Sequence, residues 1–216
     1  MLVVRKDDFS KTQWFELPAQ WVFHFGNAWE DSNGVIRFDG ARSDTPEAMT
    51  TSFREIMRGR LLPSPPSVHH QYQIDTKHGS AREMPLLAMG IESEFPCINP
   101  NLSTQRNRFL YFLSSDKKDP APHPSLTSVS AFDLEGGKLT SFRYPNTKIP
   151  EEHIFVPKPG ARSEAEGWLV GTTLDYVNER TELNLFDAQA VDAGPIASAT
   201  LPYALPLGLH GKFLAS

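Results

Sequence analysis

Short runs rich in β-branched and aromatic residues recur along almost the whole chain, and they limit what it can fold into. Gly, Pro, Asn and Asp residues separate the runs and favour turns between them. The runs span residues 20–29, 34–40, 85–91, 107–115, 126–134, 138–145, 153–158, 167–176, 181–188, 195–202 and 208–214. This pattern predicts an all-β protein with mainly antiparallel strands.

One segment departs from the strand pattern. From about residue 45 to 60 the apolar residues recur at helical spacing, and Gly59 and Pro63 are placed to end a helix. The proline-rich stretch at about 62–70 then predicts a surface loop, because proline lacks the N–H that a central strand needs. We therefore expect one domain over residues 1–216, with this helix and loop as an insertion.

Charge and cysteine content narrow the possible partners and compartment. The net charge is -5 and the chain has no basic run, which argues against a nucleic-acid surface and a polybasic membrane patch. Cys97 is the one cysteine and has no internal disulfide partner. The first residues carry too few apolar side chains for a signal-peptide core. These features predict a cytoplasmic protein.

Two hairpin-like stretches resemble each other. "SAFDLEGGKLTSF" and "NLFDAQAVDAGPIASA" both contain Phe-Asp followed by a Gly-containing turn, and Asp133 and Asp187 lie 54 positions apart (187 − 133). Such spacing suits successive four-stranded units of a β-propeller. Two unrelated hairpins would share the same turn residues, so the pattern leaves both interpretations open.

Histidines are the main candidates for chemistry. His24 in "FHFGN" and His210 in "LGLHGKF" are flanked by apolar residues and closely followed by glycine. Each is either a core histidine with one good hydrogen bond or a metal ligand, and their spacing does not decide. His153 begins a predicted strand, where a surface position and a functional role are equally open. The remaining histidines lie in polar or proline-rich segments and are predicted to be solvated: His69, His70, His78 and His123.

Four stretches, in the same order and at similar intervals, resemble signature motifs of the carotenoid cleavage oxygenases. They are "FHFGNAWED", "ESEFPCINP", "EEHIFVPKPGARSEAEGWLV" and "LPLGLHGKF". The resemblance implies a seven-bladed propeller with a nonheme Fe(II) ion held on its axis by four histidines. Members of this superfamily use dioxygen to cleave a conjugated carbon–carbon double bond into two carbonyl products.

The resemblance assigns roles to four residues. His24 matches the third iron-binding histidine of the superfamily and His210 the fourth, while Glu94 and Glu152 match glutamates that accept a hydrogen bond from a ligand imidazole. Neutral imidazole suits iron, and a carboxylate behind the ring fixes the tautomer that presents a lone pair to the metal. The apolar neighbours expected to keep the centre dry and to line a substrate site are Phe23, Phe25 and Leu209.

The resemblance also has gaps. It covers only the C-terminal part of a full-length member, so the chain is expected to form a partial propeller with two of the four histidine ligands. The other two, and one further glutamate, are expected in a missing N-terminal portion, without which the chain should be inactive. Cys97 stands where the superfamily usually has arginine. Expected partners are dioxygen and an apolar polyene or stilbene-like substrate, with at most peripheral membrane contact.

Two other hypotheses remain open from the sequence. The chain can be a noncatalytic β module that binds lipid or protein through its exposed blade faces. Alternatively, two copies can each supply His24 and His210 to one symmetric four-histidine site, although two partial rings would then have to close around a common axis.

Overall fold

Three four-stranded antiparallel sheets follow one another along the chain. The computed structural model describes residues 1–58, 60, 65–88, 90–123 and 125–214. In each sheet the strands lie side by side in chain order. The first sheet comprises β3 (Trp21–Glu30), β4 (Val35–Ser43), β5 (Val68–Asp75) and β6 (Ser80–Pro85). The second comprises β7 (Ile91–Cys97), β8 (Phe109–Asp116), β9 (Ser128–Asp133) and β10 (Lys138–Arg143). The third comprises β11 (Lys148–Pro157), β12 (Gly167–Asp175), β13 (Arg180–Asp187) and β14 (Pro195–Thr200).

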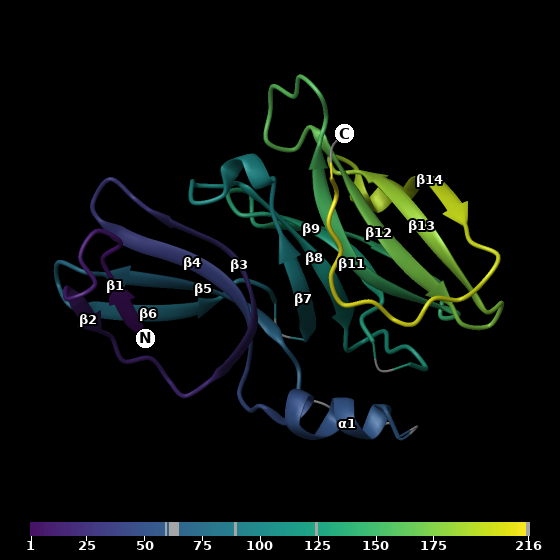
Figure 1. The fold of residues 1–216 in the computed structure, drawn as a ribbon, viewed down its shortest axis with the longest axis horizontal. Helices are drawn as coiled ribbons and strands as arrows, with labels where there is room; N and C mark the ends of the chain where they lie inside the picture. Colours follow the sequence, from purple (N-terminus) through teal and green to yellow (C-terminus); the bar gives the residue numbers. More distant parts are fainter. Residues whose placement is uncertain (59, 61–64, 89, 124, 215–216) are drawn as a thin grey trace.

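The first strand of each sheet lies toward the first strand of the next. β3 contacts β7, and β7 contacts β11, while the later strands extend outward (Figure 1). Sheets that radiate from a line of inner strands are the blades of a propeller, whose neighbours bury apolar faces against each other. Within the described residues no sheet closes on itself. The all-β prediction is confirmed, and the number of blades in a complete ring stays a prediction.

The repeated Phe-Asp pattern marks equivalent places in two successive sheets. Asp133 ends β9 and Asp187 ends β13, and each is the last residue of the third strand of its sheet. The carboxylate of Asp133 accepts the backbone N–H of Glu135 at 3.0 Å, and that of Asp187 accepts the N–H of Gln189 at 2.9 Å. The two aspartates therefore make the same contact at the start of the connection between the third and fourth strands, which fits the propeller interpretation, although the two connections differ in length.

Apolar packing joins the second sheet to the third. Leu169 on β12 and Phe186 on β13 are fully buried, and they belong to one cluster with Tyr111 and Leu113 of β8. Residues of β12 alternate between buried and half-buried along its whole length, the period expected of a strand with one face in the core. The first sheet has a separate core around Phe38, and a third cluster of the same size surrounds Leu110.

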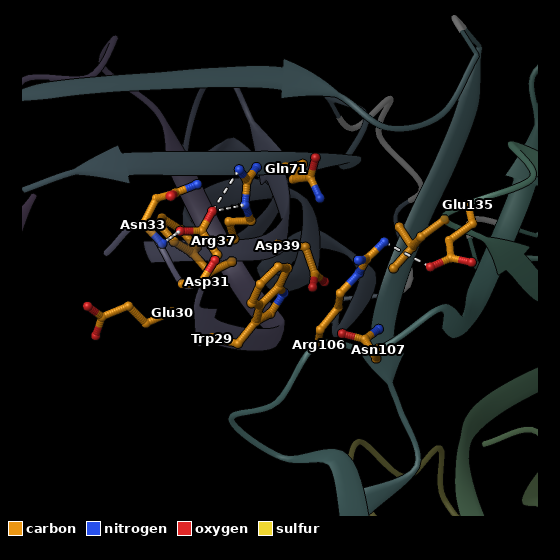
Figure 2. A pocket seen from close by; sticks show the side chains of 13 residues that line it. Trp29, Glu30, Asp31, Asn33, Arg37, Asp39, Gln71, Arg106, Asn107 and Glu135 are labelled. Carbon is orange, nitrogen blue, oxygen red and sulfur yellow. Dashed lines mark hydrogen bonds and ion pairs between the residues drawn. The ribbon is translucent and has the colours of Figure 1, made fainter. Parts of the chain in front are cut away.

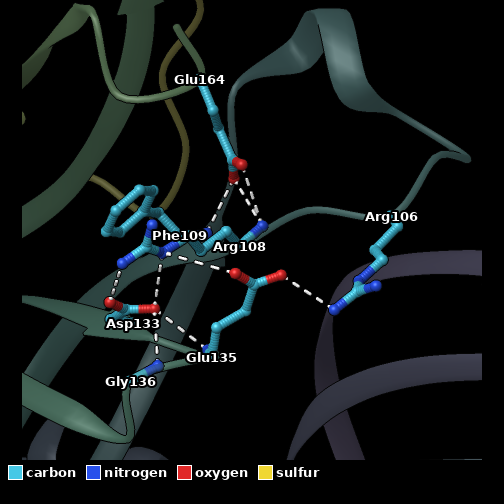
Figure 3. Close-up of polar contacts among 7 residues, drawn as sticks. All are labelled: Arg106, Arg108, Phe109, Asp133, Glu135, Gly136 and Glu164. Carbon is cyan, nitrogen blue, oxygen red and sulfur yellow. Dashed lines mark hydrogen bonds and ion pairs between the residues drawn. The ribbon is translucent and has the colours of Figure 1, made fainter.

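Polar side chains also tie the second sheet to the third (Figure 3). The Glu164 carboxylate, from the loop between β11 and β12, accepts the backbone N–H of Arg108 at 2.8 Å and of Phe109 at 2.7 Å. The Arg108 guanidinium in turn binds Asp133 at 2.6 Å and holds the pKa of that carboxyl well below its usual range. Glu164 therefore fixes the start of β8 against the neighbouring blade.

Two strand predictions are wrong. Residues 85–91 are not one strand, because β6 ends at Pro85 and β7 begins at Ile91. Leu87 between them is buried at 6% exposure, and apolar residues in a connecting segment produce the same signal as a strand. Residues 208–214 lie in a segment that pairs with no strand. The sequence also missed β5 and β6, and the short hairpin of β1 (Leu2–Val4) and β2 (Thr12–Trp14).

The helical insertion is shorter than predicted. A π-helical turn, η1 (Ala48–Ser52), leads into α1 (Phe53–Ile56), and the rest of the predicted span 45–60 is not helical where it is described. Gly59 and Pro63, expected to end the helix, lie outside the described residues. Two single 3₁₀ turns complete the helical elements: η2 (Pro100–Leu102) and η3 (Val191–Ala193). None of the helices in the described part of the chain has the length and apolar character needed to cross a membrane.

The predicted loop 62–70 gives way to a strand at its end, which corrects two histidine predictions. β5 begins at Val68, so His69 and His70 lie in a strand and are buried. The His69 Nε2 atom is 2.7 Å from the Asp39 carboxylate on β4, and this hydrogen bond offsets the free-energy cost of burying the polar ring. His78 is exposed, as predicted. His123 is half-buried, and desolvation lowers its pKa.

The burial of His153 on β11 makes the stability of the protein depend on pH. Desolvation lowers the pKa of His153 from 6.5 to about 4, so between these values the unfolded chain binds the extra proton and the folded chain does not. Stability should therefore fall as pH drops from 6.5 toward 4, by up to about 3 kcal/mol. As pH drops across this range, the urea concentration at the unfolding midpoint should decline less steeply in His153→Gln than in the wild-type chain. An equal reduction in slope for the exposed His78→Gln would contradict the assignment.

Candidate metal centre

His24 lies on the innermost strand of the first sheet, where that strand is irregular. The pairing of β3 with β4 shifts register between Val22 and His24 and again between Phe25 and Ala28. Such bulges change which way a side chain points and increase the local twist. His24 consequently reaches the neighbouring blade, and only 16% of its side chain is exposed.

Glu94 on β7 holds the His24 ring. The Nδ1 atom of His24 is 2.8 Å from Oε2 of Glu94, and the other carboxylate oxygen accepts the hydroxyl of Ser67 at 2.7 Å. β7 also changes register between Glu94 and Cys97, and Phe95 within this bulge has a positive φ of 56°. A carboxylate only accepts, so the His24 Nδ1 atom carries the proton and Nε2 presents a lone pair.

Glu152 on β11 holds His210 in the same way. The Nδ1 atom of His210 is 3.2 Å from Oε1 of Glu152, and Oε2 accepts the N–H of Gly211 at 2.7 Å. The pairing of β11 with β12 shifts register between Pro150 and His153, which frees Glu152 from the regular ladder. His210 lies in the unpaired segment that follows β14, and 57% of its side chain is exposed.

The two imidazoles meet across this site although 186 positions separate them in the chain. Their Nε2 atoms are 3.2 Å apart and the rings are nearly perpendicular, at 79°. The Phe95 ring packs beside both, with centroids 4.9 Å from His24 and 5.8 Å from His210. The two Nε2 atoms lie at hydrogen-bond distance, so they can share either a proton or a metal ion.

The donor atoms suit a divalent transition metal. For metal–nitrogen bonds of about 2.1 Å, a nitrogen–nitrogen separation of 3.2 Å corresponds to an angle of about 100° at the metal. Imidazole with a carboxylate behind it is a common ligand arrangement for iron and zinc. The described residues contain no group of three or more His, Cys, Asp or Glu side chains placed to hold a metal. This part of the chain therefore offers two ligands.

The expected apolar wall is only partly present around the two histidines. Phe23 contacts the His24 ring edge-on at 4.4 Å, whereas Phe25 packs against Phe38 and is 59% exposed. Leu209 is 58% exposed and borders a cavity of about 180 Å³ beside His210. The wall residue that the sequence missed is Phe95, because its position depends on a positive φ that no residue pattern reveals.

The Cys97 thiol makes a structural hydrogen bond between two blades. Its thiol donates to the carbonyl oxygen of His153 at 3.2 Å, across the interface between β7 and β11. Burial raises the pKa of the Cys97 thiol to about 12, so the thiol stays protonated and unreactive at neutral pH.

The larger cavity, about 610 Å³, lies between the first and second sheets near the far end of β3 (Figure 2). Two ion pairs lie in its lining: Arg37 binds Asp31 at 3.0 Å, and Arg106 binds Glu135 at 2.8 Å. Its described lining contains no histidine. This cavity is therefore separate from the two-histidine site.

The chain matches the family described as Retinal pigment epithelial membrane protein over residues 1–215. The matching fold and sequence define a carotenoid cleavage oxygenase-type protein, and the chain belongs to this family. It is 25% identical over 225 residues to isoeugenol monooxygenase of Pseudomonas putida, covering 96% of this chain and 44% of that protein. It is 27% identical over 228 residues to a carotenoid cleavage dioxygenase of Crocus sativus, covering 97% of this chain and 39% of that protein.

A solved structure has the same fold. A mutant of Synechocystis apocarotenoid oxygenase superposes with a TM-score of 0.86 at 25% identity, over 100% of this chain and 43% of that one. The chain thus spans less than half the length of the relatives it matches.

The Glu94 carboxylate should set the tautomer of His24. In Glu94→Gln the replacement amide both donates and accepts, so the preference for a proton on Nδ1 is lost. We expect ¹⁵N shifts of the His24 ring to show one dominant tautomer in the wild-type chain and a mixture in the variant. Exposed His78 serves as the internal reference. An unchanged His24 spectrum would show that Glu94 does not hold this ring.

Proposed function

We propose that this chain is the C-terminal portion of a nonheme Fe(II) dioxygenase that cleaves a conjugated carbon–carbon double bond of a carotenoid, apocarotenoid or stilbene into two carbonyl products. His24 and His210 supply two of the four histidine ligands. The observation that carries the proposal is the pair of Nε2 atoms 3.2 Å apart, each on a ring braced by its own glutamate. Membership of the family supports the same assignment.

The residues of this chain would hold and position the metal ion. His24 and His210 direct neutral nitrogen lone pairs to one point, and Glu94 and Glu152 offset the positive charge that such ligands leave on a metal. When bound, the ferrous ion would supply the site at which dioxygen reacts. Phe95 packs against both rings and shields one side of the pair from water.

Two observations support the substrate class: the names of the relatives and the apolar side chains around the site. The relatives are named for carotenoid and apocarotenoid cleavage and for oxidation of isoeugenol. Phe23 and Phe95 beside His24 provide apolar contact area of the kind that a conjugated, uncharged substrate needs. Most of the substrate wall would come from the remainder of a complete ring.

The open sides of the three sheets support the incomplete-ring proposal. Along β14 most residues are exposed, including Ile196 at 57%, and Leu183 on β13 is 45% exposed. A propeller normally covers such faces with the neighbouring blade. His210 is also more than half exposed, which leaves room for the other two ligands. The isolated chain should therefore bind a metal weakly and lack cleavage activity.

The test uses a protein in which an N-terminal portion completes the ring. There, His24→Ala or His210→Ala should abolish iron retention and cleavage, because each removes a nitrogen ligand that water replaces poorly. Iron-to-protein ratios and product analysis provide the measurements. His78→Ala is the control, since that exposed ring binds only Asp75. Unchanged iron content in both site variants would refute the assignment and favour a noncatalytic β module.

A further inference from the structure

Few contacts hold the segment that carries His210. After β14 the chain runs without strand partners, and the N–H of Leu205 lies 2.9 Å from the hydroxyl of Thr181 on β13. From residue 206 to 214, the hydrogen bonds within the described part of the chain reach only Glu151, Glu152 and His24. Two adjacent acidic side chains therefore carry most of the attachment.

The bulge in β11 lets both acids reach the same segment. In a regular strand, consecutive side chains point to opposite faces of the sheet. Glu151 and Glu152 lie inside the register shift between Pro150 and His153, where the extra residue removes this alternation. Both carboxylates consequently accept hydrogen bonds from the segment 208–211.

Glu151 is buried, and its contacts differ from those of Glu152. Only 8% of Glu151 is exposed; its Oε1 accepts the Gly208 N–H at 3.0 Å, and its Oε2 accepts the Thr172 hydroxyl on β12. It forms none of the ion pairs found among the described residues. A buried carboxylate without a cation relies on its hydrogen-bond donors, so both contacts are strongly favoured.

We propose that Glu151 is a positioning residue for His210. It fixes the backbone at Gly208, two residues before the histidine, while Glu152 fixes the backbone at Gly211, one residue after it. Bracketed from both sides, the His210 ring is held with Nε2 toward His24. The expected effect of Glu151 on metal binding rests on the proposed function, whereas its expected effect on the backbone of residues 208–211 does not.

Glu151→Gln tests the positioning role in the 216-residue chain. Glutamine keeps the shape but loses the negative charge and one accepting oxygen, so neither Gly208 nor Thr172 keeps a charged acceptor. Loss of a charge-assisted hydrogen bond should speed amide exchange at Gly208 and Gly211 by at least about tenfold. NMR-detected hydrogen exchange measures this change. Amides of β12 and β13 should keep their rates.

Glu182→Gln is the matched control. Glu182 is an equally buried carboxylate of the same sheet, but it binds Lys148 at 2.5 Å and does not touch the segment. This variant should leave Gly208 exchange unchanged. Thr172→Val removes only one donor to Glu151, so it should give a smaller acceleration and serves where Glu151→Gln folds poorly. Unchanged Gly208 exchange in folded Glu151→Gln or Thr172→Val would overturn the positioning role.

Cobalt binding separates this proposal from the proposed function. Co²⁺ titration followed by visible absorption should show about tenfold weaker binding in Glu151→Gln than in the wild-type chain, the loss typical of a residue behind a metal ligand. A wild-type chain that binds no Co²⁺ would refute metal binding by its two histidines alone and leave the amide exchange to decide the role of Glu151. Wild-type affinity in the variant, together with unchanged exchange, would refute the positioning role alone.

Discussion

The contact between the Nε2 atoms of His24 and His210 imposes the strictest geometric demand on this structure. At a separation of 3.2 Å the two nitrogens share a proton or a metal ion, and either one requires both rings to be held in fixed orientations. Glu94 and Glu152 hold the rings from two different sheets. The distance between the two Nε2 atoms therefore depends on how all three sheets are placed relative to one another.

The orientation of the site residues depends on β-bulges in otherwise regular strands. Each inner strand changes register at the site: β3 at His24, β7 after Glu94, and β11 around Glu152. A regular strand would send alternate side chains into the sheet core or away from it. The three bulges turn the site residues toward a common line, and the flat parts of the same strands keep the apolar interfaces between blades.

The fold is kept at low sequence identity. At about 25% identity to its relatives, the chain superposes on a solved relative with a TM-score of 0.86. Its blade interfaces combine apolar packing with single polar contacts, such as the one from the half-buried Cys97 thiol to the carbonyl of His153. Packing of this kind depends mainly on matched volume and polarity, so many sequences can satisfy it.

The sequence by itself determined the strand-rich class and most strand positions, because alternation and turn residues are local signals. It left the equivalence of Asp133 and Asp187 open, and it named four site candidates through ordered motifs. Tertiary structure decided the rest. His69 appeared solvated beside prolines but is buried against Asp39, and the predicted strand 85–91 spans the end of β6 and the start of β7. The meeting of His24 with His210, and the part taken by Phe95 and Glu151, arise from bulges and inter-sheet packing. These are contacts between residues far apart in the chain, which no local pattern encodes.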